Sequence, residues 1–159
     1  MTQELAAAIL DLARAKGLTV TCAESCTGGM VAAALTDIAG SSAIFERGFV
    51  TYSNAAKTDM LGVPAALLDA HGAVSEEVAQ AMARGALTAA RADVAVAISG
   101  IAGPGGSEFK PEGRVCYSVS TPRGTTSETV EHGAQGRAEV RAAATRHALV
   151  LIQEALNAL

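Results

Sequence analysis

Ser25 stands directly before a polar, glycine-rich stretch made of Cys26, Thr27, Gly28 and Gly29. Backbone N–H groups at the start of a helix stabilise negative charge, whether on a bound phosphate or on an oxyanion that develops during a reaction. A serine hydroxyl becomes an effective nucleophile only when a base removes its proton. This segment therefore offers a nucleophile beside the donors that acyl-transfer chemistry needs.

Lys57 is the candidate base for Ser25, because burial disfavours a charged ammonium and lowers the pKa of a lysine. Each residue also has a simpler interpretation. Serine and threonine before an apolar run usually cap a helix, and most lysines lie at the surface. The chemical hypothesis therefore requires a fold that brings Ser25 and Lys57 into contact.

The elements that would position these residues are predicted from hydrophobic spacing and turn residues. Residues 3–16 carry apolar side chains at helical intervals, and Gly17 ends that helix. The stretch 94–98 is continuously apolar, as in a strand covered on both faces. We expect strands at 18–22, 48–52, 94–98, 115–121 and 125–131. We expect helices at 3–16, 30–38, 54–60, 64–70, 75–92 and 138–156.

The alternation of strands and helices predicts an α/β fold, with one domain over residues 1–159. We expect a three-layer α/β/α sandwich whose sheet is mostly parallel, with an antiparallel hairpin at one side. In such sheets, ligands bind outside the carboxyl ends of the strands. The glycine- and proline-rich loop 99–113 follows the buried strand at 94–98. We therefore expect this loop and the Ser25 turn to form one site.

The composition excludes several classes of function. The formal net charge of -4 and the pI near 5.3 indicate no basic surface for a nucleic acid. No stretch approaches the roughly 18 apolar residues of a membrane span, and the amphipathic N-terminal segment is unlike a signal peptide. We therefore expect a cytoplasmic protein with neither a membrane nor a nucleic acid as partner.

The histidines and cysteines predict neither a metal site nor a disulfide. The histidines show no ligand spacing, and an odd number of cysteines without a secretion signal is typical of free thiols. These residues are His71, His132, His147, Cys22, Cys26 and Cys116. The loop 100–106 matches neither the dinucleotide nor the P-loop motif, so we expect no cofactor.

Two other nucleophile patterns are weaker than the one at Ser25. Ser107 and Lys110 match the S-x-x-K motif of penicillin-interacting serine enzymes, but Pro111 keeps Lys110 out of the helix that this motif requires. Cys26 lacks the local signature of a known family of cysteine enzymes. Ser25 is therefore the preferred nucleophile.

Several ordered blocks, which together cover nearly the whole chain, resemble one known family. The blocks are Ala23-Glu24-Ser25-Cys26-Thr27-Gly28-Gly29, Tyr52-Ser53-Asn54-Ala55-Ala56-Lys57, Gly72-Ala73-Val74-Ser75, Ser99-Gly100-Ile101-Ala102-Gly103-Pro104, and Lys110-Pro111 with Gly113. They resemble the CinA C-terminal domain family, the nicotinamide mononucleotide deamidases. The resemblance implies hydrolysis of the carboxamide of nicotinamide mononucleotide to nicotinic acid mononucleotide and ammonia.

The resemblance also implies roles for residues at matching positions. Ser25 would be the nucleophile and Lys57 its general base, and Tyr52 would assist proton transfer or position the lysine. The glycine-rich turns and the start of the helix at 54–60 would hold the phosphate, ribose or amide of the small nucleotide. The residues implied for binding are Thr27, Gly28, Gly29, Asn54, Ser99, Gly100, Ala102 and Gly103.

One position departs from the family pattern, because Gly136 stands where the family has an acid before Arg137. Two alternatives remain open. The first is a serine amidase that uses Ser25 and Lys57 on another small amide. The second is a non-catalytic, nucleotide-binding module related to competence. The positive mean hydropathy of +0.29 favours a homodimer, and the start at Met1 favours the stand-alone form of the domain.

Overall fold

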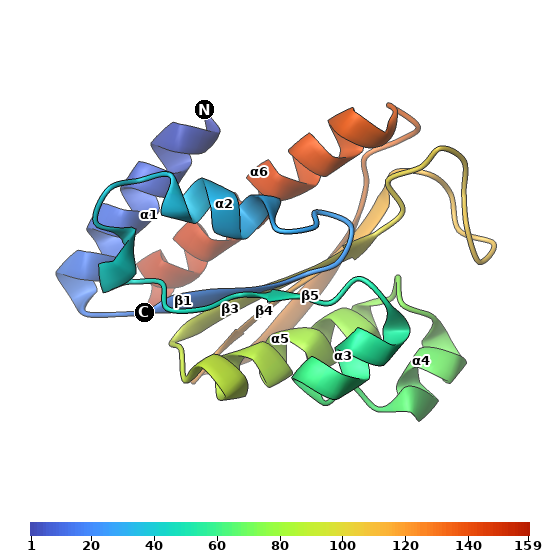
Figure 1. The fold of residues 1–159 in the computed structure, drawn as a ribbon, viewed down its shortest axis with the longest axis horizontal. Coiled ribbons are helices and arrows are strands. Elements are labelled where there is room, and N and C mark those ends of the chain that lie inside the picture. The colour runs from blue at the N-terminus through green and yellow to red at the C-terminus, as the bar shows by residue number, and fades with distance from the viewer.

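A computed structural model describes residues 1–159 and divides them among strands, α-helices and one 3₁₀ turn (Figure 1). The strands are β1 (Val20–Glu24), β2 (Phe49–Val50), β3 (Val94–Gly100), β4 (Arg114–Thr121) and β5 (Gly124–Glu131). The helices are α1 (Thr2–Lys16), α2 (Met30–Thr36), α3 (Asn54–Leu61), α4 (Ala65–His71), α5 (Glu76–Ala90) and α6 (Arg137–Ala158), and the 3₁₀ turn is η1 (Ser41–Ala43).

The sheet has the strand order β2-β1-β3-β4-β5. β1 pairs in parallel with both β2 and β3, whereas β4 pairs antiparallel with both β3 and β5. The expected α/β sandwich with an antiparallel hairpin at one side is confirmed, and its sheet contains two parallel and two antiparallel pairings. The parallel strands β1, β2 and β3 all end at the same edge.

Two helix layers cover the two faces of the sheet: α1, α2 and α6 on one face, and α3, α4 and α5 on the other (Figure 1). Successive strand residues point to opposite faces. In β3, Val94, Val96 and Ile98 pack with the first layer, whereas Ala95 and Ala97 pack with the second. The small alanines allow α5 to approach the sheet closely.

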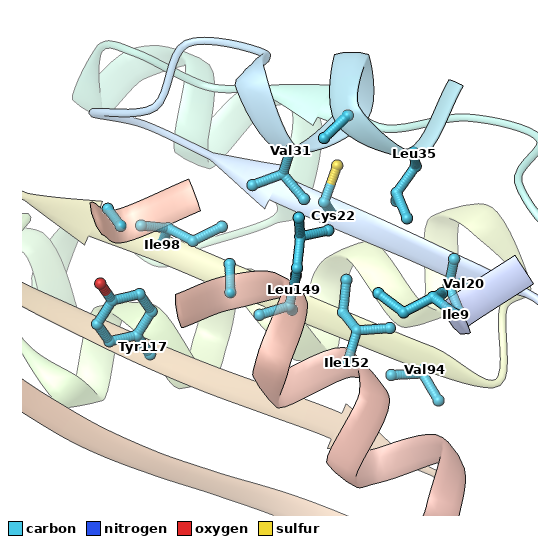
Figure 2. Close-up of a cluster of buried hydrophobic side chains, with 14 of the residues drawn as sticks. Ile9, Val20, Cys22, Val31, Leu35, Val94, Ile98, Tyr117, Leu149 and Ile152 are labelled. Atoms are coloured by element: carbon cyan, nitrogen blue, oxygen red, sulfur yellow. The ribbon is translucent and has the colours of Figure 1, made fainter. Parts of the chain in front are cut away.

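The larger hydrophobic cluster lies under α1, α2 and α6. Figure 2 shows Leu149 and Ile152 of α6 close to the strands, with Ile9 of α1 and Val31 of α2 beside them. All four side chains are fully buried. Truncating such a side chain to alanine costs about 2–5 kcal/mol. This cluster therefore anchors α6, whose first residues lie near the carboxyl edge of the parallel strands.

β1 begins two residues later than the sequence predicts. The expected strand at 18–22 is found at Val20–Glu24, where it pairs residue by residue with β3. Thr19 is held just outside the strand, because its amide donates a hydrogen bond of 2.9 Å to the Asp93 carboxylate. The shift places Glu24 inside a buried strand. A charged residue is rare there unless hydrogen bonds compensate for its burial.

None of the helices is long and apolar enough to cross a lipid bilayer. Cys22, Cys26 and Cys116 are buried free thiols. Burial raises the pKa of each thiol above its usual value. All three cysteines therefore stay protonated at neutral pH.

Gly85 of α5 packs against the end of α3, and a methyl group at this position would overlap the Leu61 carbonyl. Alanine normally stabilises a helix interior over glycine by about 1 kcal/mol. Overpacking, however, costs about 1–3 kcal/mol or more, and a backbone carbonyl cannot move aside as a side chain can. We expect Gly85→Ala to lower the free energy of unfolding by about 1–2 kcal/mol, measured by urea denaturation.

Thr88→Ala is the matched control, because Thr88 lies exposed on the same helix. We expect this substitution to change the free energy of unfolding by less than about 0.5 kcal/mol. A Gly85→Ala variant as stable as the wild type would contradict the close contact between α3 and α5.

Candidate active site

The carboxyl edge of the parallel strands carries the residues with candidate chemical roles. Ser25 directly follows β1, Lys57 lies in α3 after β2, and Gly100 ends β3. These segments surround an open cavity of about 350 Å³. The sequence-predicted residues that line it are Ser25, Tyr52, Lys57, Ser99, Gly100, Ala102 and Gly103.

Lys57 and Ser25 are in direct contact. Lys57 Nζ lies 3.2 Å from Ser25 Oγ, although the two residues are 32 positions apart in the chain. Only 1% of Lys57 and 8% of Ser25 is exposed. The same Nζ donates hydrogen bonds to the carbonyl oxygens of Thr51, at 2.9 Å, and Tyr52, at 3.4 Å. The fold therefore brings together the two residues that the chemical hypothesis pairs.

Lys57 Nζ donates hydrogen bonds to three oxygens, those of Ser25, Thr51 and Tyr52, and a neutral amine can keep the two bonds to the carbonyls. A neutral amine has two N–H groups and one lone pair, and the two N–H groups can bind the carbonyls of Thr51 and Tyr52. The lone pair is then available to accept the Ser25 hydroxyl proton. Burial lowers the pKa of Lys57 below the usual lysine range, which favours this neutral form. Such a contact would allow Lys57 to act as a base toward a Ser25 nucleophile.

The sequence of α3 explains why Lys57 points inward. Ser53 caps the helix by accepting a hydrogen bond of 3.0 Å from the Ala56 amide. Leu61, one turn after Lys57, is buried in the cluster beneath α5. Residues four positions apart share one face of a helix. The packing of Leu61 therefore turns Lys57 toward the interior as well.

Four of the residues implied for binding do not line the cavity: Thr27, Gly28, Gly29 and Asn54. The Glu24 carboxylate accepts hydrogen bonds from the Thr27 hydroxyl, at 2.6 Å, and the Gly29 amide, at 3.2 Å. The Gly28 amide closes a turn with the carbonyl three residues earlier. Asn54 is exposed at the start of α3. The amides of Gly28 and Gly29 are therefore not free to bind a substrate.

The Cys26 amide lies beside Ser25 and donates no hydrogen bond to another backbone group. Cys26 lines the cavity next to Ser25. The amide of the residue after a nucleophile is a common oxyanion donor. Burial raises the pKa of the Cys26 thiol to about 11, which disfavours its reactive thiolate form at neutral pH.

Tyr52 and Arg137 meet at the rim of the cavity. Tyr52 holds Lys57 through its backbone carbonyl, while its hydroxyl accepts a hydrogen bond of 3.0 Å from Arg137 Nη2. Arg137 Nη1 donates to the Gly103 carbonyl at 2.8 Å. Sequence reasoning did not assign Arg137 to the site, because 85 positions separate it from Tyr52. The only sequence signal was its place in the segment where the resemblance expects an acid followed by arginine.

Polar contacts hold the long loop after β3. The Ser99 hydroxyl donates to the Ala73 carbonyl at 2.7 Å. The Glu112 carboxylate accepts hydrogen bonds from the amides of Gly105, at 2.6 Å, and Gly136, at 3.2 Å. Gly136 is the position where the resemblance expects an acid. In this chain, the carboxylate at the start of α6 is that of Glu112, which comes from the loop after β3 and accepts a hydrogen bond from the Gly136 amide.

A family model described as the CinA C-terminal domain matches residues 2–156. The chain belongs to the CinA C-terminal domain family. The CinA fold is shared by solved structures. The competence/damage inducible protein CihA from Agrobacterium tumefaciens is 50% identical, with a TM-score of 0.94 over 98% of this chain and 95% of that one. A CinA superfamily protein from Klebsiella pneumoniae is 39% identical, with a TM-score of 0.95 over 100% and 99%.

Curated relatives of this CinA domain differ in length. The nicotinamide-nucleotide amidohydrolase PncC of Escherichia coli strain K12 is 61% identical over 137 residues, which are 86% of this chain and 83% of that protein. A CinA-like protein of Mycolicibacterium gilvum is 54% identical over 142 residues, which are 89% of this chain but 34% of that protein. The same domain is thus found nearly alone and within longer proteins.

Proposed function

We propose that this CinA domain hydrolyses the carboxamide of nicotinamide mononucleotide to nicotinic acid mononucleotide and ammonia. The observation that carries the proposal is the buried contact of 3.2 Å between Lys57 Nζ and Ser25 Oγ on a cavity of about 350 Å³. The identity of 61% to the PncC amidohydrolase of Escherichia coli supports the choice of substrate.

The first half of the reaction forms an ester on Ser25. Its Oγ attacks the carboxamide carbon while Lys57 Nζ takes the hydroxyl proton. The carbonyl electrons move to oxygen, and the Cys26 amide donates a hydrogen bond to the resulting oxyanion. The Lys57 ammonium then protonates the amide nitrogen as the C–N bond breaks, so ammonia leaves and a nicotinoyl ester remains on Ser25.

The second half hydrolyses this ester and restores the enzyme. Lys57 Nζ, neutral again, takes a proton from a water molecule that attacks the ester carbon. The Lys57 ammonium returns that proton to Ser25 Oγ as the C–O bond breaks, and the acid is released. The carbonyls of Thr51 and Tyr52 hold Nζ in place through both halves, which keeps the base oriented toward Ser25.

Arg137 is the group that we assign to the substrate phosphate. It lines the cavity, and its present acceptors, the Gly103 carbonyl and the Tyr52 hydroxyl, are neutral. A guanidinium binds phosphate through parallel, charge-assisted hydrogen bonds that are stronger than those to neutral acceptors. Glu108 lines the same cavity and can accept hydrogen bonds from ribose hydroxyls.

The direct test is ammonia release by the purified protein from nicotinamide mononucleotide, nicotinamide riboside, nicotinamide and a panel of other small amides. We expect release from the mononucleotide, with nicotinic acid mononucleotide identified by chromatography. Release from a different amide alone would replace the substrate but keep the amidase. No release from any amide would overturn the proposed function.

We expect Arg137→Ala to raise KM for nicotinamide mononucleotide by about 10- to 100-fold, since hydrogen bonds to a charged group contribute about 1.5–3 kcal/mol. The value of kcat should change much less, because Arg137 contacts no reacting atom. For nicotinamide riboside, which has no phosphate, kcat/KM should be nearly the same in wild type and variant. Steady-state kinetics with both substrates measures the difference.

Arg123→Ala is the control, because Arg123 donates to the Ala158 carbonyl and does not line the cavity. This variant should keep wild-type KM for the mononucleotide. An equal loss of kcat/KM on both substrates in Arg137→Ala would contradict the phosphate assignment and leave Arg137 as a support for the loop.

A further inference from the structure

Glu24 is a fully buried carboxylate at the end of β1, immediately before Ser25. Its Oε1 accepts hydrogen bonds from the Thr27 hydroxyl at 2.6 Å, the Gly29 amide at 3.2 Å and the Val31 amide at 3.0 Å. Its Oε2 accepts from the Ala32 amide at 3.0 Å. The Cys22 thiol donates to the same Oε2 at 3.5 Å. Each of the five hydrogen-bond partners of the carboxylate is therefore a donor, so the ionised form fits the site.

No lysine, arginine or histidine forms a salt bridge with Glu24. A buried charge without a cationic partner is costly unless hydrogen bonds replace the lost water. A neutral serine or threonine caps most helices at much lower cost. α2 has only seven residues. Capping so short a helix does not by itself account for a buried carboxylate with this many donors.

The same hydrogen bonds define the turn that carries the nucleophile. From one side, the Glu24 carboxylate binds the amides and hydroxyl of the turn. From the other side, Arg141 of α6 donates to the carbonyls of Cys26, at 3.0 Å, and Thr27, at 3.3 Å. The Ser25 amide is tied to the Ile98 carbonyl of β3 at 3.0 Å. The backbone around Ser25 therefore has little freedom to move relative to Lys57.

We propose that Glu24 is the positioning residue of the active site: its buried carboxylate holds the turn so that Ser25 Oγ meets Lys57 Nζ and the Cys26 amide stays free for the oxyanion. Because Glu24 takes the Gly29 amide, the turn cannot rearrange to offer that amide in place of the Cys26 amide. The inference rests on the proposed roles of Ser25 and Lys57, and it goes beyond them by naming the group that sets their geometry.

Glu24→Gln is the test variant, because glutamine has nearly the same shape but replaces one acceptor oxygen with an NH₂ donor. That donor would face N–H groups, and the turn would have to shift. A displacement near 1 Å at a reacting group can cost about 10²-fold in rate. We therefore expect kcat to fall by about 10²-fold, with KM changed by less than about threefold, because Glu24 does not line the cavity.

Ile152→Ala is the matched control for stability. Ile152 is a buried residue of α6 in the larger hydrophobic cluster, and it does not line the cavity. We expect this variant to lower Tm at least as much as Glu24→Gln while kcat stays at the wild-type value. Thr27→Val removes one donor to the carboxylate without changing Glu24, and we expect an intermediate loss of kcat. If Glu24→Gln does not fold, Thr27→Val still tests the proposal.

A readout independent of the substrate separates this proposal from the proposed function. The rate at which a fluorophosphonate labels Ser25, followed by mass spectrometry, reports nucleophile geometry whether or not nicotinamide mononucleotide is cleaved. We expect labelling to slow in Glu24→Gln and less in Thr27→Val, but not in Ile152→Ala. Unchanged labelling and unchanged kcat in both turn variants would overturn the positioning role. A wild type that is neither labelled nor active would overturn both proposals.

Discussion

Ser25→Ala is expected to reduce ammonia release from nicotinamide mononucleotide by about 10⁴-fold or more, the scale of loss when a nucleophile is removed. Alanine cannot form the nicotinoyl ester, and no other hydroxyl is in contact with Lys57 Nζ. The protein should stay folded, since Ser25 accepts no cap hydrogen bond at the start of α2. Single-turnover kinetics, with circular dichroism to confirm folding, measures the effect.

Cys26→Ala tests whether the neighbouring thiol acts as the nucleophile in place of Ser25. Burial raises the pKa of the Cys26 thiol to about 11, so almost no thiolate exists at neutral pH. Alanine retains the backbone amide that we assign to the oxyanion. We therefore expect Cys26→Ala to keep activity within about fivefold of wild type. An active Ser25→Ala variant together with an inactive Cys26→Ala variant would assign the chemistry to the cysteine.

Much of the site geometry follows from local sequence patterns. The turn after β1 and the loop after β3 were expected at one edge, because parallel strands separated by helices end on the same side of the sheet. The apolar run at 94–98 identified the central strand, and the helix that carries Lys57, expected at 54–60, is found at Asn54–Leu61. These signals are short-range, and each is set by residues within one element.

The role of the turn amides was not predictable in the same way. The sequence indicated Thr27, Gly28 and Gly29 as donors for a ligand, yet Glu24 occupies the Gly29 amide. A glutamate is normally expected at the surface of a protein. Its burial depends on β1 lying between β2 and β3, and this tertiary arrangement has no signature in the local sequence.

Arg137 was missed for a related reason. Its contacts with Gly103 and Tyr52 join positions that are 34 and 85 residues away. They form only because the hydrophobic cluster under α6 sets where that helix begins. Arg137 is the first residue of α6, so its place beside the cavity follows from how this helix packs on the sheet and not from the residues next to it in the chain.

Lys57→Met is expected to lower kcat by about 10³-fold, within the range for loss of a general base. Methionine keeps the buried stem of the side chain but has no lone pair basic enough to accept the Ser25 proton. Lys57→Arg should be equally inactive, because a guanidinium keeps its proton at all accessible pH values. High activity in Lys57→Arg would show that the positive charge, and not the base, is required.

The pH dependence of kcat/KM in the wild type reports the protonation state of Lys57. Only the neutral amine is a base, so kcat/KM should rise with pH through the pKa of Lys57, which burial lowers from the usual lysine range. The plateau should therefore begin at a lower pH than an exposed lysine would give. The nearby Glu108 carboxylate raises the pKa of Lys57, because negative charge favours the ammonium.

Glu108→Gln removes that charge while keeping the shape of the side chain. The neutral amine should then persist to lower pH, so the rising limb of kcat/KM should move to lower pH in this variant. A limb that moves to higher pH, or that stays in place in both Glu108→Gln and Lys57→Met, would assign the titration to another group. The direction of this one shift thus tests whether the buried amine beside Ser25 is the base.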